Sequence, residues 1–104
     1  MIESIKGAEN LDEILKVEGL DAIFIGPYDL SASIGKVGKF NNEKFKNLKN
    51  LIIKKCKDRK IACGVHVVEP DKKGLKMAIK EGYTFIAYSI DTVFLNTSSL
   101  KPEL

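Results

Sequence analysis

Two carboxylates, Glu3 and Asp29, each follow an apolar segment. They are the strongest candidates in the sequence for residues that bind a ligand or a metal ion. Glu3 ends the short opening Met1-Ile2, and Asp29 follows residues 22–25, which we predict to be a buried strand. If the two strands are parallel neighbours, both carboxylates lie at the carboxyl-terminal rim of the sheet, where α/β folds place their chemistry. Such a pair suits Mg²⁺, which takes one or two protein carboxylates. It also fits a surface glutamate beside an aspartate that caps a short helical turn.

Three further candidates lie between the predicted strand and Asp29. Gly26 and Pro27 end the strand and let the backbone approach a ligand, while the amides of Tyr28 and Asp29 can face an anion. The same residues also fit a plain tight turn. His66, the one histidine, lies near the end of another predicted strand. There it fits either a proton carrier or metal ligand, or a hydrogen-bonded core residue.

Strands and helices that alternate along the chain must position these residues. We recognise strands by apolar or β-branched runs, and helices by apolar residues three and four positions apart. Apolar strands separated by helices favour a parallel sheet buried on both faces. Four such units fit either a small doubly wound sheet or half of an eight-stranded barrel. The strands are expected at residues 1–4, 22–25, 61–68 and 84–90, and the helices at 9–17, 43–56, 70–81 and 91–95.

Capping residues predict where the helices begin and end. Asn41 or Asn42 is expected to cap the second helix, Pro70 to lie in the first turn of the third, and Gly82 to end it. We expect one domain over residues 1–95 and a polar, frayed tail over residues 96–104. The residues expected to face the core are Phe45, Leu48, Ile52 and Cys56 in the second helix and Leu75, Ala78 and Ile79 in the third.

The composition is that of an ordinary globular domain, with 104 residues, 44% hydrophobic and 30% charged. The net charge is +3, and the lysines lack interleaved aromatic residues, which favours a solvated face over a nucleic-acid surface. No apolar run is long enough to span a membrane, and the first residues lack the pattern of a signal peptide. Cys56 and Cys63 have no metal-ligand spacing, so we expect reduced thiols in a cytoplasmic protein.

Four segments together resemble the HpcH/HpaI aldolase family, whose members are metal-dependent pyruvate aldolases on a TIM barrel. The most specific is the pattern Gly-Pro-x-Asp-Leu-Ser-x-Ser-x-Gly. The resemblance covers nearly the whole chain but only the C-terminal part of the family's domain. It implies an α/β fold that forms the C-terminal half of a (β/α)8 barrel, with about four βα units. The matching segments are residues 2–3, 10–14, 24–35 and 82–87.

The resemblance also implies a cofactor and a reaction. Mg²⁺ or Mn²⁺ would be held by Glu3 and Asp29, and pyruvate or another 2-oxo acid would bind it through keto and carboxylate oxygens. Amides around Tyr28 would hold the carboxylate, in a site formed by Gly26, Pro27, Tyr28, Asp29 and His66. The metal would act as a Lewis acid while a 4-hydroxy-2-oxo acid is cleaved to pyruvate and an aldehyde. Tyr28 and His66 replace the small and aliphatic residues of many members, which implies an altered aldehyde side of the pocket.

The family's catalytic histidine and arginine lie upstream of the matched segment, and Arg59 falls in the wrong segment to replace the arginine. We therefore expect the metal-binding half of a class II aldolase that is inactive alone. The alternative is a non-catalytic half-barrel that associates as a homo-oligomer or with a complementing N-terminal half, because an open barrel exposes strand edges and core. A third possibility is a free-standing doubly wound domain that binds a small anion at residues 26–33.

Overall fold

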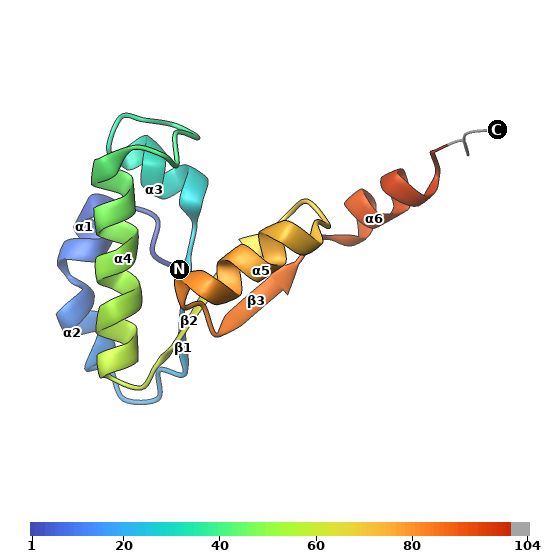
Figure 1. Ribbon diagram of the computed structural model, residues 1–104. Helices are drawn as coiled ribbons and strands as arrows, with labels where there is room; N and C mark the ends of the chain where they lie inside the picture. The colour runs from blue at the N-terminus through green and yellow to red at the C-terminus, as the bar shows by residue number, and fades with distance from the viewer. Residues whose placement is uncertain (101–104) are drawn as a thin grey trace.

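The computed structural model describes residues 1–100 and contains a three-stranded parallel sheet with helices packed along it (Figure 1). Strand follows helix through most of the chain, as the sequence pattern predicts. The strand at Ala22–Ile25 has the predicted bounds, and the other two are shorter than predicted. The elements are α1 (Ile5–Glu9), α2 (Leu11–Leu15), β1 (Ala22–Ile25), α3 (Pro27–Ser33), α4 (Glu43–Asp58), β2 (Ala62–Val67), α5 (Lys72–Glu81), β3 (Phe85–Tyr88) and α6 (Asp91–Ser98).

The strands follow one another in the order β1-β2-β3, and every neighbouring pair is parallel. The first predicted strand, residues 1–4, is reduced to one parallel bridge between Ile2 and Ile25. The Ile2 amide donates to the Phe24 carbonyl at 2.7 Å, and the Gly26 amide donates to the Ile2 carbonyl at 3.0 Å. The segment stops there because the Ser4 hydroxyl accepts a hydrogen bond from the third residue of α1 and so caps that helix.

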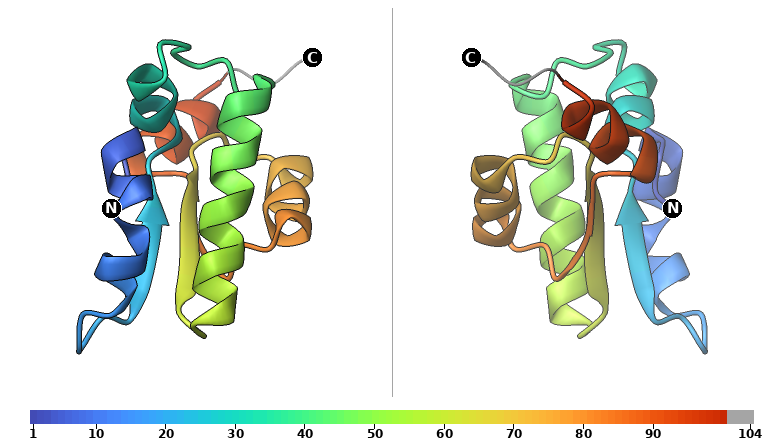
Figure 2. Two further views of the ribbon diagram at one scale, coloured as in Figure 1. Left: turned by 90° about the vertical axis from the view of Figure 1, so that its left-hand side faces the viewer. Right: turned by 90° about the vertical axis from the view of Figure 1, so that its right-hand side faces the viewer.

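Helices α4 and α5 cover the same face of the sheet. The inward residues of β2, Cys63 and Val65, are buried, and Gly74 of α5 lies against Val67, the next residue on that face. Figure 2 shows α1, α2 and α4 along β1 and β2, and α5 beside them. Right-handed crossovers that all run in one direction place their helices on one face, as in the wall of a barrel. A doubly wound sheet instead reverses its strand order and carries helices on both faces.

The opposite face of the sheet is uncovered among residues 1–100. Phe24 and Phe85 flank Gly64 in register and meet edge to face above it, with ring centroids 5.8 Å apart. A Cβ atom at Gly64 would lie 2.7 Å from both rings, so only glycine fits there. Phe85 is 53% exposed. The expectation of a sheet buried on both faces is therefore wrong for the described residues, because their helices supply only one covering layer.

The core lies between the helices and the covered face. In α4, Phe45, Ile52 and Cys56 are buried as predicted, and Leu48 packs against the core. In α5, Ala78 is buried and Leu75 is half-buried, but Ile79 is 59% exposed and was wrongly expected to face inward. Ile79 is exposed because α5 packs on the edge of the sheet, against β2 and β3, and no other described helix or strand packs closely on its opposite side.

Several helix ends differ from their predicted positions. The helix predicted at residues 9–17 is instead the pair α1 and α2, which meet at Asn10, whose φ of −87° and ψ of 7° interrupt the first helix. Pro70 lies outside α5, because the Asp71 carboxylate accepts from two first-turn amides and caps that helix. The caps at Asn42 and Gly82 are confirmed, the latter with a φ of 106°.

The last helix is longer than predicted. Helix α6 continues to Ser98, so the boundary expected after Leu95 falls inside a helix. Residues 101–104 of the expected tail lie outside the described residues. Within residues 1–100, every helix is too short or too polar to traverse a lipid bilayer.

Candidate functional site

Glu3 and Asp29 lie at the carboxyl ends of two neighbouring parallel segments. Glu3 directly follows the bridge between Ile2 and Ile25, and Asp29 lies in the first turn of α3, which directly follows β1. The Glu3 side chain lies over Gly26, where an added Cβ would be 3.1 Å from Glu3 Cγ and 3.5 Å from Glu3 Oε1. The fold thus brings both acidic residues to the same rim of the sheet.

Neither carboxylate has another structural partner among residues 1–100. Both side chains are exposed, and neither carboxylate makes a hydrogen bond or ion pair with another described residue. One interpretation of the sequence made Asp29 the cap of a short helical turn. That interpretation is wrong, because the helix begins at Pro27 and Gly26 is its N-cap. Both acids therefore remain available to a ligand.

The donor set at this rim suits one kind of cation. Over the described part of the chain, no three His, Cys, Asp or Glu side chains gather as a metal cluster. Two carboxylates with open surroundings leave the remaining coordination positions to water and to substrate oxygens. Mg²⁺ favours such an arrangement, because it gives up its waters reluctantly and binds through one or two carboxylates. The residues present therefore fit a hard divalent cation.

A cavity of about 200 Å³ opens at the same rim. All five residues that we expect to bind substrate line it, although His66 of β2 lies far along the chain from Gly26 and from the first turn of α3. Four apolar residues also line it and were not predicted for the site, because an apolar side chain carries no chemical signal: Met1, Phe24, Ile25 and Val68. Side chains alternate between the two faces of a strand, so Val68 lies on the same open face as His66. That alternation could have predicted Val68 as a lining residue. The lining residues are Met1, Phe24, Ile25, Gly26, Pro27, Tyr28, Asp29, His66 and Val68.

Local hydrogen bonds fix the loop and helix that carry Asp29. The Ser31 hydroxyl donates to the Tyr28 carbonyl at 2.8 Å and accepts from the Gly38 amide at 2.9 Å. The Ser33 hydroxyl accepts from the Ile5 amide at 2.9 Å and so joins α3 to the helix that follows Glu3. These contacts hold the two acidic segments against each other, and they explain why serines follow the aspartate.

His66 meets both interpretations drawn from the sequence. Its Nε2 lies 2.7 Å from the Ser89 carbonyl oxygen, which can only accept, so Nε2 donates. The ring also lines the cavity. His66 is thus a hydrogen-bonded residue of the sheet and, at the same time, a neighbour of the predicted substrate site.

The cysteines lie outside this site. Cys56 and Cys63 are both buried free thiols. The hydrogen bond that the Cys63 thiol donates to the Cys56 sulfur, together with burial, raises the pKa of Cys63. The same hydrogen bond lowers the pKa of Cys56. Both cysteines are buried members of the hydrophobic core.

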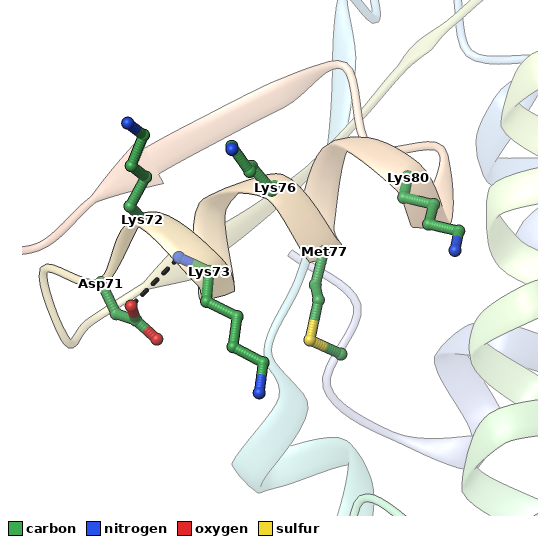
Figure 3. A pocket seen from close by; sticks show the side chains of 6 residues that line it. All are labelled: Asp71, Lys72, Lys73, Lys76, Met77 and Lys80. Atoms are coloured by element: carbon green, nitrogen blue, oxygen red, sulfur yellow. Dashed lines mark hydrogen bonds between the residues drawn. The ribbon is translucent and has the colours of Figure 1, made fainter.

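A second groove, of about 550 Å³, runs along α5 and is lined by Asp71, Met77 and four lysines (Figure 3). It includes none of the residues predicted for the site. Its lining contains no aromatic side chain on which a base could stack. The groove has the character of a solvated basic face.

Comparisons with known proteins agree on one family. The family model described as HpcH/HpaI aldolase/citrate lyase matches residues 1–97. The chain is 36% identical over 92 residues to the 2-keto-3-deoxy-L-rhamnonate aldolase of Escherichia coli O6:K15:H31 (strain 536 / UPEC). That match covers 88% of this chain and 34% of the relative, so the chain spans about a third of the relative's length.

Two solved structures show the same fold. The HpcH/HpaI aldolase from Desulfitobacterium hafniense DCB-2 has 28% identity and a TM-score of 0.81, over 94% of this chain and 38% of that one. An HpcH/HpaI aldolase/citrate lyase family protein from Burkholderia cenocepacia J2315 has 26% identity and a TM-score of 0.84, over 94% and 37%. These relatives are TIM barrels, and the α/β fold described above corresponds to part of one. The chain therefore belongs to the HpcH/HpaI aldolase/citrate lyase family.

Proposed function

We propose that this chain carries the metal-binding half of a class II pyruvate aldolase, which cleaves a 4-hydroxy-2-oxo acid to pyruvate and an aldehyde. One observation carries the proposal: two unpaired carboxylates, Glu3 and Asp29, lie at one rim beside a cavity lined by the five expected binding residues. Membership of an aldolase family supports the reaction class. The relative that acts as a 2-keto-3-deoxy-L-rhamnonate aldolase makes a hydroxylated 2-oxo acid the substrate class to test first.

In this proposal Glu3 and Asp29 hold Mg²⁺ or Mn²⁺. A bound divalent cation supplies Lewis-acid chemistry to the 2-oxo acid. Gly26 contributes by lacking a side chain, because a Cβ there would press on Glu3. The chain's own part is to hold two negative charges at the rim and leave room for substrate oxygens between them.

The first turn of α3 is proposed to hold the substrate carboxylate. The amides of Tyr28 and Asp29 lie in this turn, where helical amides have no carbonyl partner within the helix. Pro27, at the first helical position, has no amide to satisfy. The cavity, about 200 Å³, is smaller than the ~300–1,000 Å³ of typical drug-sized ligand sites. That size suits a small acid such as pyruvate, with Tyr28 and His66 on the aldehyde side.

The remaining catalytic groups are proposed to come from outside this segment. The family resemblance assigns the catalytic histidine and arginine to a part of the barrel that the matched residues do not include. We therefore expect little or no aldolase turnover from the chain alone. The two free thiols support a reducing, cytoplasmic location for the enzyme.

Metal binding tests this function directly. Titration of the chain with Mn²⁺, followed by calorimetry or electron paramagnetic resonance, should show one site that Glu3→Gln and Asp29→Asn each weaken by at least ~10-fold. The matched control is Asp21→Asn. Asp21 is an exposed acid that directly precedes β1, at the opposite end of that strand from Asp29. Equal Mn²⁺ affinity in all four proteins would refute the assignment of the two carboxylates.

A second candidate function, association without catalysis, is favoured by the uncovered sheet face. Phe85 is 53% and Val68 40% exposed there, and β3 is an edge strand among the described residues. The face would be covered by a second copy or by a complementing N-terminal half. Sedimentation equilibrium over a wide concentration range tests self-association. A well-folded monomer at every concentration, which also ignores a separately produced N-terminal half, would contradict this candidate.

A further inference from the structure

Ser89 is strained and buried at the carboxyl end of β3. Its φ of 58° lies in the left-handed region, which residues other than glycine rarely adopt. The residue is 6% exposed, and its Oγ has no hydrogen-bond partner among the described residues. A buried polar atom without a partner and a left-handed backbone each destabilise the fold. Features that destabilise a fold and are nevertheless kept gather at functional sites.

The backbone of Ser89 holds His66 from two directions. The Ser89 amide donates to the Val67 carbonyl at 2.6 Å, and the Ser89 carbonyl accepts from His66 Nε2 at 2.7 Å. The first bond anchors Ser89 to the strand that carries the histidine. The second fixes the orientation of the ring. The left-handed turn therefore determines where the Ser89 carbonyl lies against the imidazole.

This hydrogen bond also determines which ring nitrogen can accept. A carbonyl accepts only a protonated nitrogen, so a neutral His66 carries its proton on Nε2 and leaves Nδ1 as an acceptor. No other described residue hydrogen-bonds to the ring. The side chain lines the cavity beside Tyr28 and Asp29. An acceptor in this cavity suits a ligand that brings a hydroxyl group.

We propose that Ser89 is a positioning residue that presents His66 Nδ1 as the acceptor for a hydroxyl group on C5 or beyond. This group belongs to the aldehyde-derived part of the substrate and is distinct from the 4-hydroxyl that becomes the aldehyde oxygen. The inference rests on the proposed function and deepens it. It names the substrate class as 4-hydroxy-2-oxo acids that carry a second hydroxyl, on C5 or beyond. It assigns His66 a role in recognition, and Ser89 acts only through His66.

The tautomer of His66 tests the positioning role without any activity. His66 is the chain's one histidine, so long-range proton–nitrogen spectra of the ¹⁵N-labelled chain report its two ring nitrogens without ambiguity. We expect the form protonated at Nε2 in the wild type. A wild-type ring protonated at Nδ1 would overturn the proposal, whatever the variants do.

Three variants of Ser89 separate the carbonyl from the hydroxyl. Ser89→Gly accepts a positive φ and keeps the carbonyl, and Ser89→Ala removes only Oγ, so both should keep the Nε2-protonated form. Ser89→Val disfavours the left-handed backbone, because its branched Cβ crowds it, and should shift the tautomers towards those of a free imidazole. If the valine variant does not fold, the alanine variant still decides, because a changed tautomer there would assign the effect to Oγ and refute the carbonyl's role.

Two matched ligands test the hydroxyl. In the presence of Mg²⁺, 4,5-dihydroxy-2-oxopentanoate should shift the His66 Nδ1 resonance and bind about threefold to tenfold more tightly than 4-hydroxy-2-oxopentanoate. His66→Leu should remove that preference. Equal shifts from both ligands would refute hydroxyl recognition. If neither ligand binds, the proposed function and hydroxyl recognition both fail, whereas the tautomer spectrum still decides the role of Ser89.

Discussion

The two ends of the sheet differ in how they are packed. At the β1 end, Ile2, Ile25 and Leu30 are at most 4% exposed, and the rim above them carries Glu3 and Asp29. At the β3 end, no residue of the strand is fully buried, and α6 has no buried residue. The proposed metal site thus lies on the part of the molecule that forms its own core. The β3 end instead presents apolar side chains that no described residue covers.

The difference is visible in the shape of the molecule. In Figure 1, α1 to α4 form a closely packed body, whereas α5, β3 and α6 extend away from it. Exposed apolar residues concentrate in that extension, including Phe85, Phe94 and Leu95. Exposed apolar residues gathered in one region are typical of an interface or of an open core. In the proposed function, the acidic pair is therefore organised by the packed end of the sheet, whereas the β3 end would be covered by a partner.

The largest expected effect contrasts one apolar residue from each end. Ile25→Ala should cost about 2–5 kcal/mol of unfolding free energy, because Ile25 is fully buried and its loss leaves a cavity. Phe85→Ala should cost less than about 1 kcal/mol in the monomer, because Phe85 is 53% exposed. Urea denaturation measures both. A Phe85→Ala cost that equals the Ile25→Ala cost would show that the β3 end is covered in solution.

The next expected effect probes the rim itself. Gly26→Ala should weaken Mn²⁺ binding by about 3- to 10-fold, because the new Cβ would lie 3.1 Å from Glu3 Cγ and push the carboxylate aside. Calorimetric titration measures the affinity. Gly7→Ala is the matched control, because Gly7 lies on α1, away from the cavity, and its Cβ position has 3.4 Å to the nearest atom. Equal affinities in the two variants would place Glu3 outside the metal site.

A smaller effect concerns the strain at the β3 end. Ser89→Gly should raise the unfolding free energy by up to about 1 kcal/mol, because glycine accepts the φ of 58° and removes the unpaired hydroxyl. Ser33→Gly should instead lower the unfolding free energy. Ser33 lies in helix α3, where glycine is unfavourable, and its hydroxyl accepts a hydrogen bond from the Ile5 amide. Thermal or urea denaturation distinguishes the two. A destabilised Ser89→Gly variant would mean that Oγ has a partner in solution.

The smallest expected effect is a pH dependence. Burial, with Glu81 nearby, raises the pKa of Tyr83 above its ordinary value near 10, so the folded state favours the neutral phenol. Above pH ~10 the unfolded chain binds fewer protons than the folded one, and stability falls as pH rises. Tyr83→Phe should make this decline shallower in urea denaturation between about pH 9 and pH 11. Cys63, whose pKa is also raised, contributes a decline of the same sign in both proteins, so an identical slope would contradict the assignment to Tyr83.

The sequence by itself determined the features that depend on neighbouring residues. The bounds of β1, the caps at Asn42 and Gly82, and the buried stripe of α4 follow from local patterns of apolar and capping residues. The acidic pair and the Gly-Pro turn were also recognisable, because their residue types and spacing carry chemical meaning. Local rules suffice wherever a residue's partners lie within one helical turn.

Only the tertiary structure decided the rest. It split the first helix at Asn10, started α3 at Pro27 so that Asp29 became free, and left one face of the sheet open. It also joined His66 to Ser89, 23 residues apart, through a left-handed turn that no serine pattern predicts. These outcomes depend on contacts between segments far apart in the chain, and the energy of such contacts is defined only once the strands are in register.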